Sequence, residues 1–143
     1  MNYTFEIMKH ELEIDAIERE IKKLERKVGD IDEAKRKLAN NQAQLDSLRQ
    51  KALRDVKKTQ NLGSGLNVVK KFNNNASNII NGSKYRNAIN VMEDRRAELT
   101  RKRKQFIDEI VELERRINKT NKAIDKLKEE KKKGDKWVVI RVV

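Results

Sequence analysis

The sequence predicts an all-α fold, an elongated antiparallel helical hairpin in the form of a two-helix coiled coil. Three observations support this fold class. Apolar residues recur at seven-residue spacing in two stretches of the chain, which is typical of a coiled-coil seam. A stretch rich in Gly and Asn separates them, so the chain would fold back near residue 69. The chain contains no proline and only 4% aromatic residues, which favours long helices over a compact core.

Residues 5–60 are predicted to form the first long helix. Its seam has one apolar row and a companion row that begins apolar and becomes polar. The first row is Ile17, Leu24, Ile31, Leu38, Leu45 and Ala52, and the companion row is Ile14, Ile21, Val28, Lys35, Gln42 and Arg49. Gly29 lies inside this helix at a cost of about 1 kcal/mol relative to Ala. Because the seven-residue pattern continues through Gly29, no break is expected there.

Residues 61–83 are predicted to form a turn region of broken helix. Three stretches carry turn signals: residues 61–65, 73–75 and 81–83, all rich in Asn, Gly or Ser. A short amphipathic piece of helix is expected between the first two, over residues 66–72. Ser83 is expected to cap the helix that follows, because its hydroxyl can accept a backbone hydrogen bond.

Residues 84–130 are predicted to form the second long helix and to complete a hairpin over residues 1–130. Its two seam rows are Met92, Leu99, Phe106, Leu113, Thr120 and Leu127, and Ile89, Arg96, Arg103, Ile110, Ile117 and Ile124. Three lysines followed by Gly134 are expected to end this helix, since both residue types suit a helix C-terminus. Residues 131–143 are then a basic linker and a β-branched, strand-like tail.

The polar seam residues gather in the half of the hairpin that is nearer the turn. Lys35, Gln42 and Arg49 are expected to lie near Arg96 and Arg103, and burial of like charges is costly. This half is therefore expected to stay hydrated or to be completed by a third, acidic helix. The residues predicted to bind such a partner are Leu62, Val68, Val69, Phe72, Lys35, Arg49, Arg96 and Arg103.

The net charge of +12 is concentrated in the middle of the sequence. Residues 1–33 have a net charge of −4, whereas residues 34–105 have a net charge of +13. Such a field attracts acidic protein surfaces, nucleic acid or anionic lipid. The basic stretch has few aromatic residues for base stacking and no recognisable nucleic-acid motif. Non-specific nucleic-acid binding is therefore the alternative to a helical partner protein.

The sequence gives no catalytic, cofactor-binding or metal-binding residues, so a non-enzyme without a cofactor is expected. Cysteine is absent, and the single histidine, His10, is expected to be an ordinary surface residue. Gly63-Ser64-Gly65 lacks the Lys-Ser/Thr continuation of a phosphate-binding loop. The carboxylates lie at spacings that pair them with Lys or Arg on hydrated helix faces.

Targeting signals are weak throughout the chain. Residues 1–13 lack the apolar core of a signal peptide, and the strongly apolar run Trp137–Ile140 is too short to span a bilayer. We expect no membrane span and a cytoplasmic location, with secretion beside a partner by a non-classical route as the alternative. The oligomeric state stays open, and a homo-oligomer is compatible with the seam.

The turn and its flanks carry a resemblance to a known family. Leu62-Gly63-Ser64-Gly65 is followed by Val68, Val69 and Phe72, between two long helices. This order resembles the small helical-hairpin proteins of Gram-positive type VII secretion, the WXG-like proteins, and in particular the helical partners encoded beside LXG-domain toxins. The resemblance extends over residues 10–130.

The resemblance implies a non-enzymatic adaptor, or chaperone, that binds the helical N-terminal domain of an LXG-type toxin, or a second small helical protein. It would keep the toxin competent for export. The family's aromatic-x-x-x-acid export signal has no counterpart here, since Tyr85 is followed at the fourth position by Ile89 and Phe106 by Ile110. A partner would have to supply it. A second resemblance, in length, charge and hairpin layout, is to the basic coiled-coil hairpins of flagellar and type III export machinery.

Overall fold

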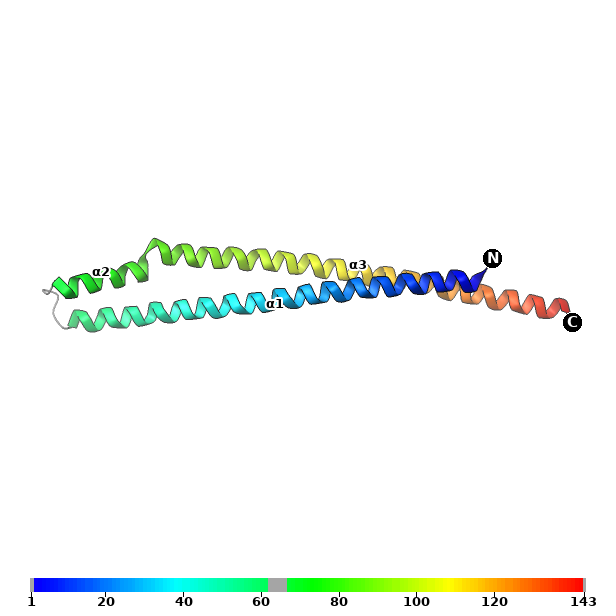
Figure 1. Cartoon of the computed structure of the whole chain (residues 1–143), viewed down its shortest axis with the longest axis horizontal. Coiled ribbons are helices and arrows are strands. Elements are labelled where there is room, and N and C mark those ends of the chain that lie inside the picture. Colours follow the sequence, from blue (N-terminus) through cyan, green and yellow to red (C-terminus); the bar gives the residue numbers. More distant parts are fainter. Residues whose placement is uncertain (1, 62–66, 143) are drawn as a thin grey trace. The chain divides into compact units, whose positions relative to one another are not determined.

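The chain is an all-α helical hairpin, which confirms the expected fold class (Figure 1). The structure is a computed structural model that describes the backbone of residues 2–61 and 67–142 and the side chains of residues 2–58, 70–78 and 82–134. Its helices are α1 (Tyr3–Asn61), α2 (Asn67–Asn81) and α3 (Ser83–Val142). No stretch within the described part of these helices is long and apolar enough to cross a membrane.

Helix α1 is continuous over 59 residues and agrees closely with the predicted helix over residues 5–60. Asn2 caps it: the side-chain oxygen of Asn2 accepts the backbone N–H of Phe5 at 3.2 Å, and its carbonyl accepts that of Glu6 at 3.2 Å. Gly29 does not interrupt the helix, as the continuing seam predicts. A Cβ atom at Gly29 would meet nothing within 4 Å.

The junction between α2 and α3 differs from the sequence prediction in two ways. The expected break at Asn73–Asn75 is wrong, because these residues lie inside α2, where the buried side chain of Ala76 offsets the poor helix propensity of Asn. The cap of α3 is Gly82 and not Ser83, since the Gly82 carbonyl accepts the Arg86 N–H at 3.3 Å. A Cβ atom at Gly82 would collide with the carbonyl oxygen of Asn78.

The C-terminal part of the chain continues as helix. Helix α3 runs through Gly134 to Val142, so the predicted helix end and the strand-like tail over residues 131–143 are wrong. A strand obtains its backbone hydrogen bonds from a neighbouring strand, and the described residues contain no strand. A helix that has already formed gains one hydrogen bond for each added residue. The helical state therefore prevails over the β-branched composition.

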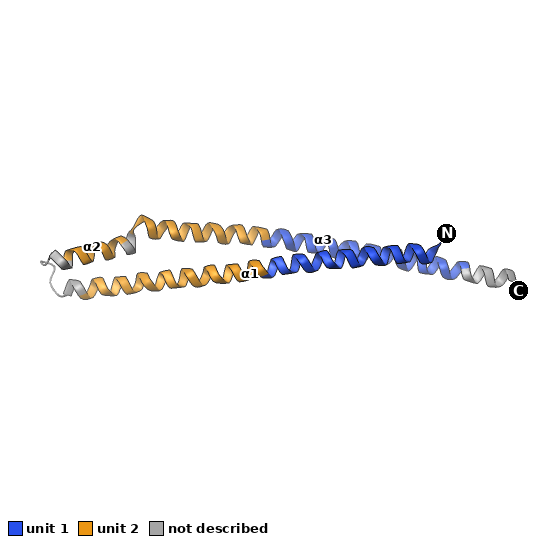
Figure 2. Cartoon of the chain, viewed as in Figure 1, with its two compact units in different colours: residues 1–29, 103–143 blue, residues 30–102 orange. Residues whose placement is uncertain are grey.

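The chain divides into two units, shown in Figure 2. Unit 1 comprises Met1–Gly29 and Arg103–Val143, and unit 2 comprises Asp30–Lys102. In unit 1 the start of α1 lies beside the later part of α3, where the Lys131 ammonium donates a hydrogen bond to the Thr4 hydroxyl at 3.1 Å. The Lys27 ammonium lies 5.4 Å from the centroid of the Phe106 ring. Residues near the start of α1 thus lie beside residues late in α3, and residues further along α1 lie beside earlier residues of α3. The two helices of this unit are therefore antiparallel.

Among the described residues of unit 1, the buried apolar ones all belong to the predicted seam. Ile17, Ile21, Leu24 and Ile124 are buried, and each contributes roughly 1.5–3 kcal/mol relative to an exposed position. In unit 2, Ile31 and Ala76 are the buried apolar residues among those described. Among the described residues, unit 1 thus has four buried apolar side chains and unit 2 has two.

Candidate functional site

The seam of unit 2 contains polar side chains where a coiled coil normally has apolar ones. Lys35, Gln42 and Arg49 are half-buried at the expected seam positions of α1. Long basic side chains can cover apolar surface with their methylene stems while their charged ends reach water. The seam of unit 2 therefore carries long polar side chains that a further helix could cover.

Arg49 packs against Tyr85 of α3, whereas the sequence predicts that it lies near Arg96 and Arg103. Its guanidinium carbon is 5.3 Å from the centroid of the Tyr85 ring. The Tyr85 hydroxyl donates a hydrogen bond to an Asp46 carboxylate oxygen at 2.9 Å, and this bond raises the pKa of Tyr85 above its usual value. The Nε–H of Arg49 is buried, and none of the described residues supplies it with a hydrogen-bond acceptor.

The two arginines of α3 have different environments. Arg96 belongs to unit 2 and is exposed, although it occupies a seam position by spacing. Arg103 belongs to unit 1, where it is half-buried and has interactions of its own. The predicted collection of like charges is therefore not formed at Arg49, which has an aromatic ring as its neighbour.

The predicted binding residues of the turn region are described only in part. Leu62 lies outside the described residues. Val68 and Val69 lie in α2, but their side chains are outside the described part of the chain. The Phe72 side chain is described and is 42% exposed, a high value for an aromatic residue. Of these four residues, Phe72 is the one whose availability to a partner follows from the structure.

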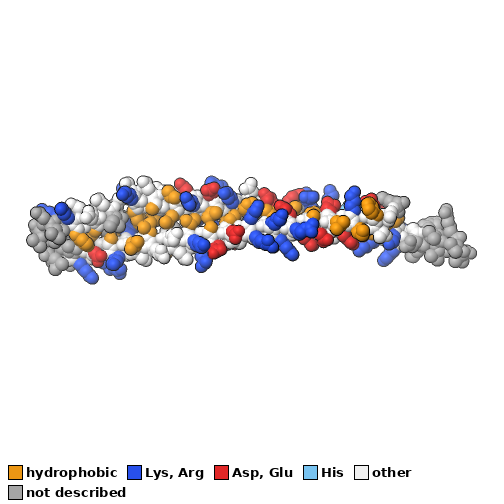
Figure 3. All heavy atoms as spheres, viewed as in Figure 1, with side chains coloured by type: hydrophobic (Ala, Val, Ile, Leu, Met, Phe, Trp, Pro, Cys, Tyr) orange, Lys and Arg blue, Asp and Glu red, His pale blue; other side chains and the backbone are white. Residues whose placement is uncertain are grey.

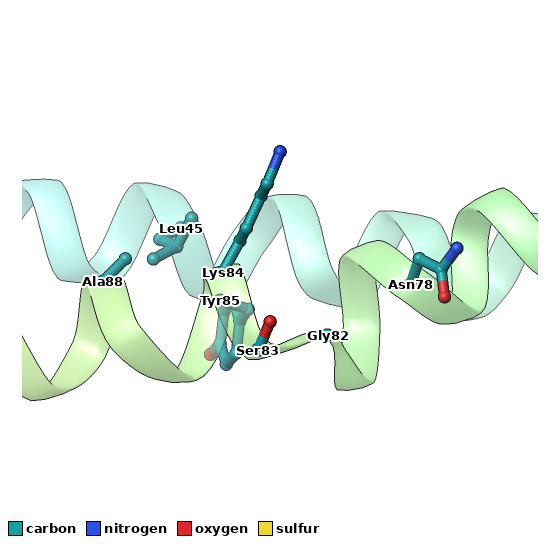
Figure 4. A pocket seen from close by; sticks show the side chains of 7 residues that line it. All are labelled: Leu45, Asn78, Gly82, Ser83, Lys84, Tyr85 and Ala88. Atoms are coloured by element: carbon teal, nitrogen blue, oxygen red, sulfur yellow. The ribbon is translucent and has the colours of Figure 1, made fainter.

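A groove lies at the junction between α2 and α3 in unit 2 (Figure 4). It has a volume of about 650 Å³. Its lining residues come from all three helices and from the junction: Leu45, Asn78, Gly82, Ser83, Lys84, Tyr85 and Ala88. In Figure 4 the Lys84 side chain is extended, and Leu45 and Ala88 lie at one end of the groove.

Heptad spacing indicates that a seam position beside this groove has no side chain. Gly82 lies seven residues before Ile89, and Tyr85 lies seven residues before Met92, so both continue the seam rows of α3 backward. The row of Ile89 therefore reaches a position that has no side chain. Extension of the two rows backward from Ile89 and Met92 is the sequence signal that points to Gly82 and Tyr85.

The part of the sequence that contains most of the groove residues is strongly basic. Residues 35–86 carry twelve basic and two acidic side chains, a net charge of +10. Both acids are engaged, since Asp46 accepts the hydrogen bond from Tyr85 and Asp55 interacts with neighbouring groups. Figure 3 shows that acidic and basic side chains alternate more evenly over unit 1. The field of unit 2 therefore favours an acidic ligand.

A second feature that sequence reasoning missed is an apolar stripe on unit 1. Phe5, Met8 and Leu12 are 58%, 54% and 63% exposed, and their spacing of three and four residues places them on one helix face. The seam rows extend backward through Ile7 and His10 instead, so the stripe lies off the seam. The sequence signal for this stripe is the presence of large apolar residues at positions outside the seam rows.

His10 lies seven residues before Ile17 in a seam row and is half-buried, with Nδ1 3.6 Å from a Glu13 carboxylate oxygen. Within the described part of the chain, no group of three or more His, Asp or Glu side chains is arranged to hold a metal ion.

No protein-family model matches this chain, and neither a curated protein nor a solved structure gives a match. The features that bear on function are therefore the helical hairpin itself, the half-polar seam of unit 2 and the groove at the α2–α3 junction.

Proposed function

We propose that this chain is a non-enzymatic adaptor that binds a helical partner protein through unit 2. The observation that carries the proposal is the half-polar seam: Lys35, Gln42 and Arg49 are half-buried where a closed coiled coil would have apolar side chains. A third helix would cover these positions and supply acceptors such as the one that Arg49 Nε–H lacks. The exposed Phe72 ring offers apolar area on the same unit.

We further propose that the partner is the helical N-terminal domain of an LXG-type toxin and that binding keeps this domain competent for type VII export. The support is the resemblance in the order of long helix, Gly-containing turn and long helix over residues 10–130. The toxin domain would also have to contribute the aromatic-x-x-x-acid signal that this sequence lacks.

The test is co-expression of the chain with the helical domain of an LXG toxin encoded beside it, followed by size-exclusion chromatography and titration calorimetry. The variant carrying Lys35→Glu and Arg49→Glu should weaken the complex by about tenfold or more, because two charges of unit 2 are reversed. The matched control carries Lys22→Glu and Lys122→Glu, two exposed lysines of unit 1, and should bind within about twofold of the native chain.

Two results would contradict the proposal. Failure of the toxin domain to form a complex would remove the toxin-export role. A complex that is weakened equally by the unit 1 and unit 2 substitutions would show that overall charge, and not the seam of unit 2, determines binding.

The net charge of +10 over residues 35–86 favours one second candidate, non-specific binding of nucleic acid. Titration of oligothymidylate at several salt concentrations separates the two functions. A phosphate contact gives a steep fall of affinity with salt, whereas a helical partner that buries apolar area depends less on salt. Tight, strongly salt-dependent oligonucleotide binding without toxin binding would support the second candidate.

A further inference from the structure

We infer that the groove at the α2–α3 junction receives one large apolar side chain of an acidic amphipathic partner helix. This inference rests on the proposed function, because it assumes a helical partner protein. It adds the place on unit 2 where that helix is anchored and the chemistry of the face that it presents.

The groove adjoins a seam position that has no side chain. Gly82 stands where the row of Ile89 would place a side chain, and the close approach of the Asn78 carbonyl leaves no space for a Cβ atom at Gly82. Leu45 lies on the opposite helix and is half-buried, and Ala88 is small. The volume of about 650 Å³ lies within the range of roughly 300–1,000 Å³ typical of ligand pockets. The Asn78 carbonyl fills the place of a Gly82 side chain, so a side chain from outside would enter the groove beside Gly82, where Leu45 and Ala88 supply apolar lining.

Two basic side chains at or beside the groove have donor groups that lack acceptors among the described residues. Lys84 lines the groove and is exposed, and none of the described residues offers its ammonium a hydrogen bond or an ion pair. The buried Nε–H of Arg49, which packs on Tyr85, likewise has no acceptor. Carboxylates that flank the apolar anchor would satisfy both groups and would meet the net charge of +10 in residues 35–86.

The groove suits an acidic protein helix better than nucleic acid. Single-stranded nucleic acid binds by stacking bases on exposed aromatic rings. The ring that borders this groove is Tyr85, which already has the Arg49 guanidinium over it and a hydrogen bond to Asp46. The rest of the apolar lining, Leu45 and Ala88, is aliphatic. A helix, in contrast, presents an apolar anchor and carboxylates three or four residues away on one face.

The probe for the test is a fluorescein-labelled synthetic helix built from heptads of Leu, Ala and Glu. One control peptide has Lys in place of Glu, and a second has Ala in place of Leu. Binding of the full-length chain is followed by fluorescence anisotropy at several salt concentrations. The acidic Leu-containing peptide should bind, and both control peptides should bind at least about tenfold more weakly.

Two variants address the groove directly. Ala88→Phe fills the groove and Lys84→Glu reverses the charge at its edge, and each should weaken peptide binding by about tenfold. The matched controls are Ala97→Phe on an exposed face of α3 in unit 2, and Lys122→Glu in unit 1. Both controls should stay within about twofold of the native chain. Circular dichroism of each variant checks that the helices are intact, and if Ala88→Phe unfolds, Lys84→Glu and Ala88→Leu decide the question.

The results separate the inference from the proposed function. The inference is overturned if the acidic peptide does not bind the native chain at millimolar concentration. It is also overturned if the Ala88→Phe and Lys84→Glu variants bind the peptide as tightly as the native chain does, because the groove is then not the anchor site. If the LXG toxin domain also binds these variants normally, the proposed function stands without the groove. If the peptide depends on the groove but the toxin domain does not bind, the inference stands and the toxin-export role fails.

Discussion

The two units use the same pair of heptad rows and reach different degrees of closure. In unit 1 the rows bring Ile17, Leu24 and Ile124 into a buried seam. In unit 2 they bring Lys35 and Arg49 to half-buried positions. Heptad spacing thus determines which face of a helix turns toward its neighbour, and residue chemistry determines whether that face is sealed. The same heptad spacing can therefore produce a closed seam in one unit and a surface for a partner helix in the other.

The largest expected difference between the units is in the cost of truncating a seam leucine. Leu24→Ala in unit 1 should lower the free energy of unfolding by about 2–5 kcal/mol, since it leaves a cavity at a buried position. Leu45→Ala in unit 2 should cost about 1 kcal/mol, because Leu45 is half-buried beside an open groove. Urea denaturation followed by circular dichroism measures both. Equal costs would mean that unit 2 is as well packed as unit 1.

Two glycines, one in each unit, should respond to alanine with opposite signs. Gly29→Ala should raise the free energy of unfolding by about 1 kcal/mol, because the helix is preserved and the new methyl group meets nothing within 4 Å. Gly82→Ala should lower it by about 1 kcal/mol or more, because the methyl group collides with the Asn78 carbonyl. Thermal unfolding of both variants tests the signs. A stabilising Gly82→Ala would show that α2 and α3 can join as one straight helix.

Replacement of Arg49 by leucine should change stability and partner binding in opposite directions. Arg49→Leu should raise the free energy of unfolding by about 1 kcal/mol, since an apolar side chain replaces a charged group with an unsatisfied Nε–H. The same substitution should weaken partner binding. Arg96→Leu is the control, because Arg96 is exposed and should change stability by less than about 0.5 kcal/mol. If Arg49→Leu is destabilising, the contact with Tyr85 is worth more than the desolvation of the guanidinium.

The smallest expected effect is a pH dependence that is confined to unit 2. The hydrogen bond to Asp46 raises the pKa of Tyr85, so its stabilising contribution is present below the ordinary tyrosine pKa of 10.0 and is lost as pH rises through the folded-state pKa. In a Tyr3→Phe background, absorbance of tyrosinate reports Tyr85 alone. The pKa of Tyr85 should fall when Asp46→Asn is added. An unchanged titration would contradict the hydrogen bond.

The sequence predicted the helices wherever the seam pattern was continuous. The bounds of α1, the passage through Gly29 and the burial of Ile17 and Ile124 all follow from spacing alone. The prediction failed where a local signal competed with packing. Asn73–Asn75 looks like a turn, but the neighbouring Ala76 is buried and the helix continues.

The candidate site was only partly accessible to sequence reasoning. The half-buried positions of Lys35 and Arg49 could be predicted, because they follow from the seam rows. The contact of Arg49 with Tyr85 could not, because a shift of the hairpin register by a few residues changes every pair of facing residues. The groove depends on the approach of the Asn78 carbonyl to Gly82, a backbone contact that residue spacing does not describe.

The sequence separation of the contacts in each unit has a consequence for the order of folding. The hydrogen bond between Thr4 and Lys131 in unit 1 joins residues 127 apart, whereas the one between Asp46 and Tyr85 in unit 2 joins residues 39 apart. Closing the longer loop directly costs about 1 kcal/mol more in chain entropy. We therefore expect the weakly packed unit to pair first, so that substitutions in unit 2 slow refolding and substitutions in unit 1 chiefly accelerate unfolding. The residues left open for a partner would then also guide the chain to its folded state.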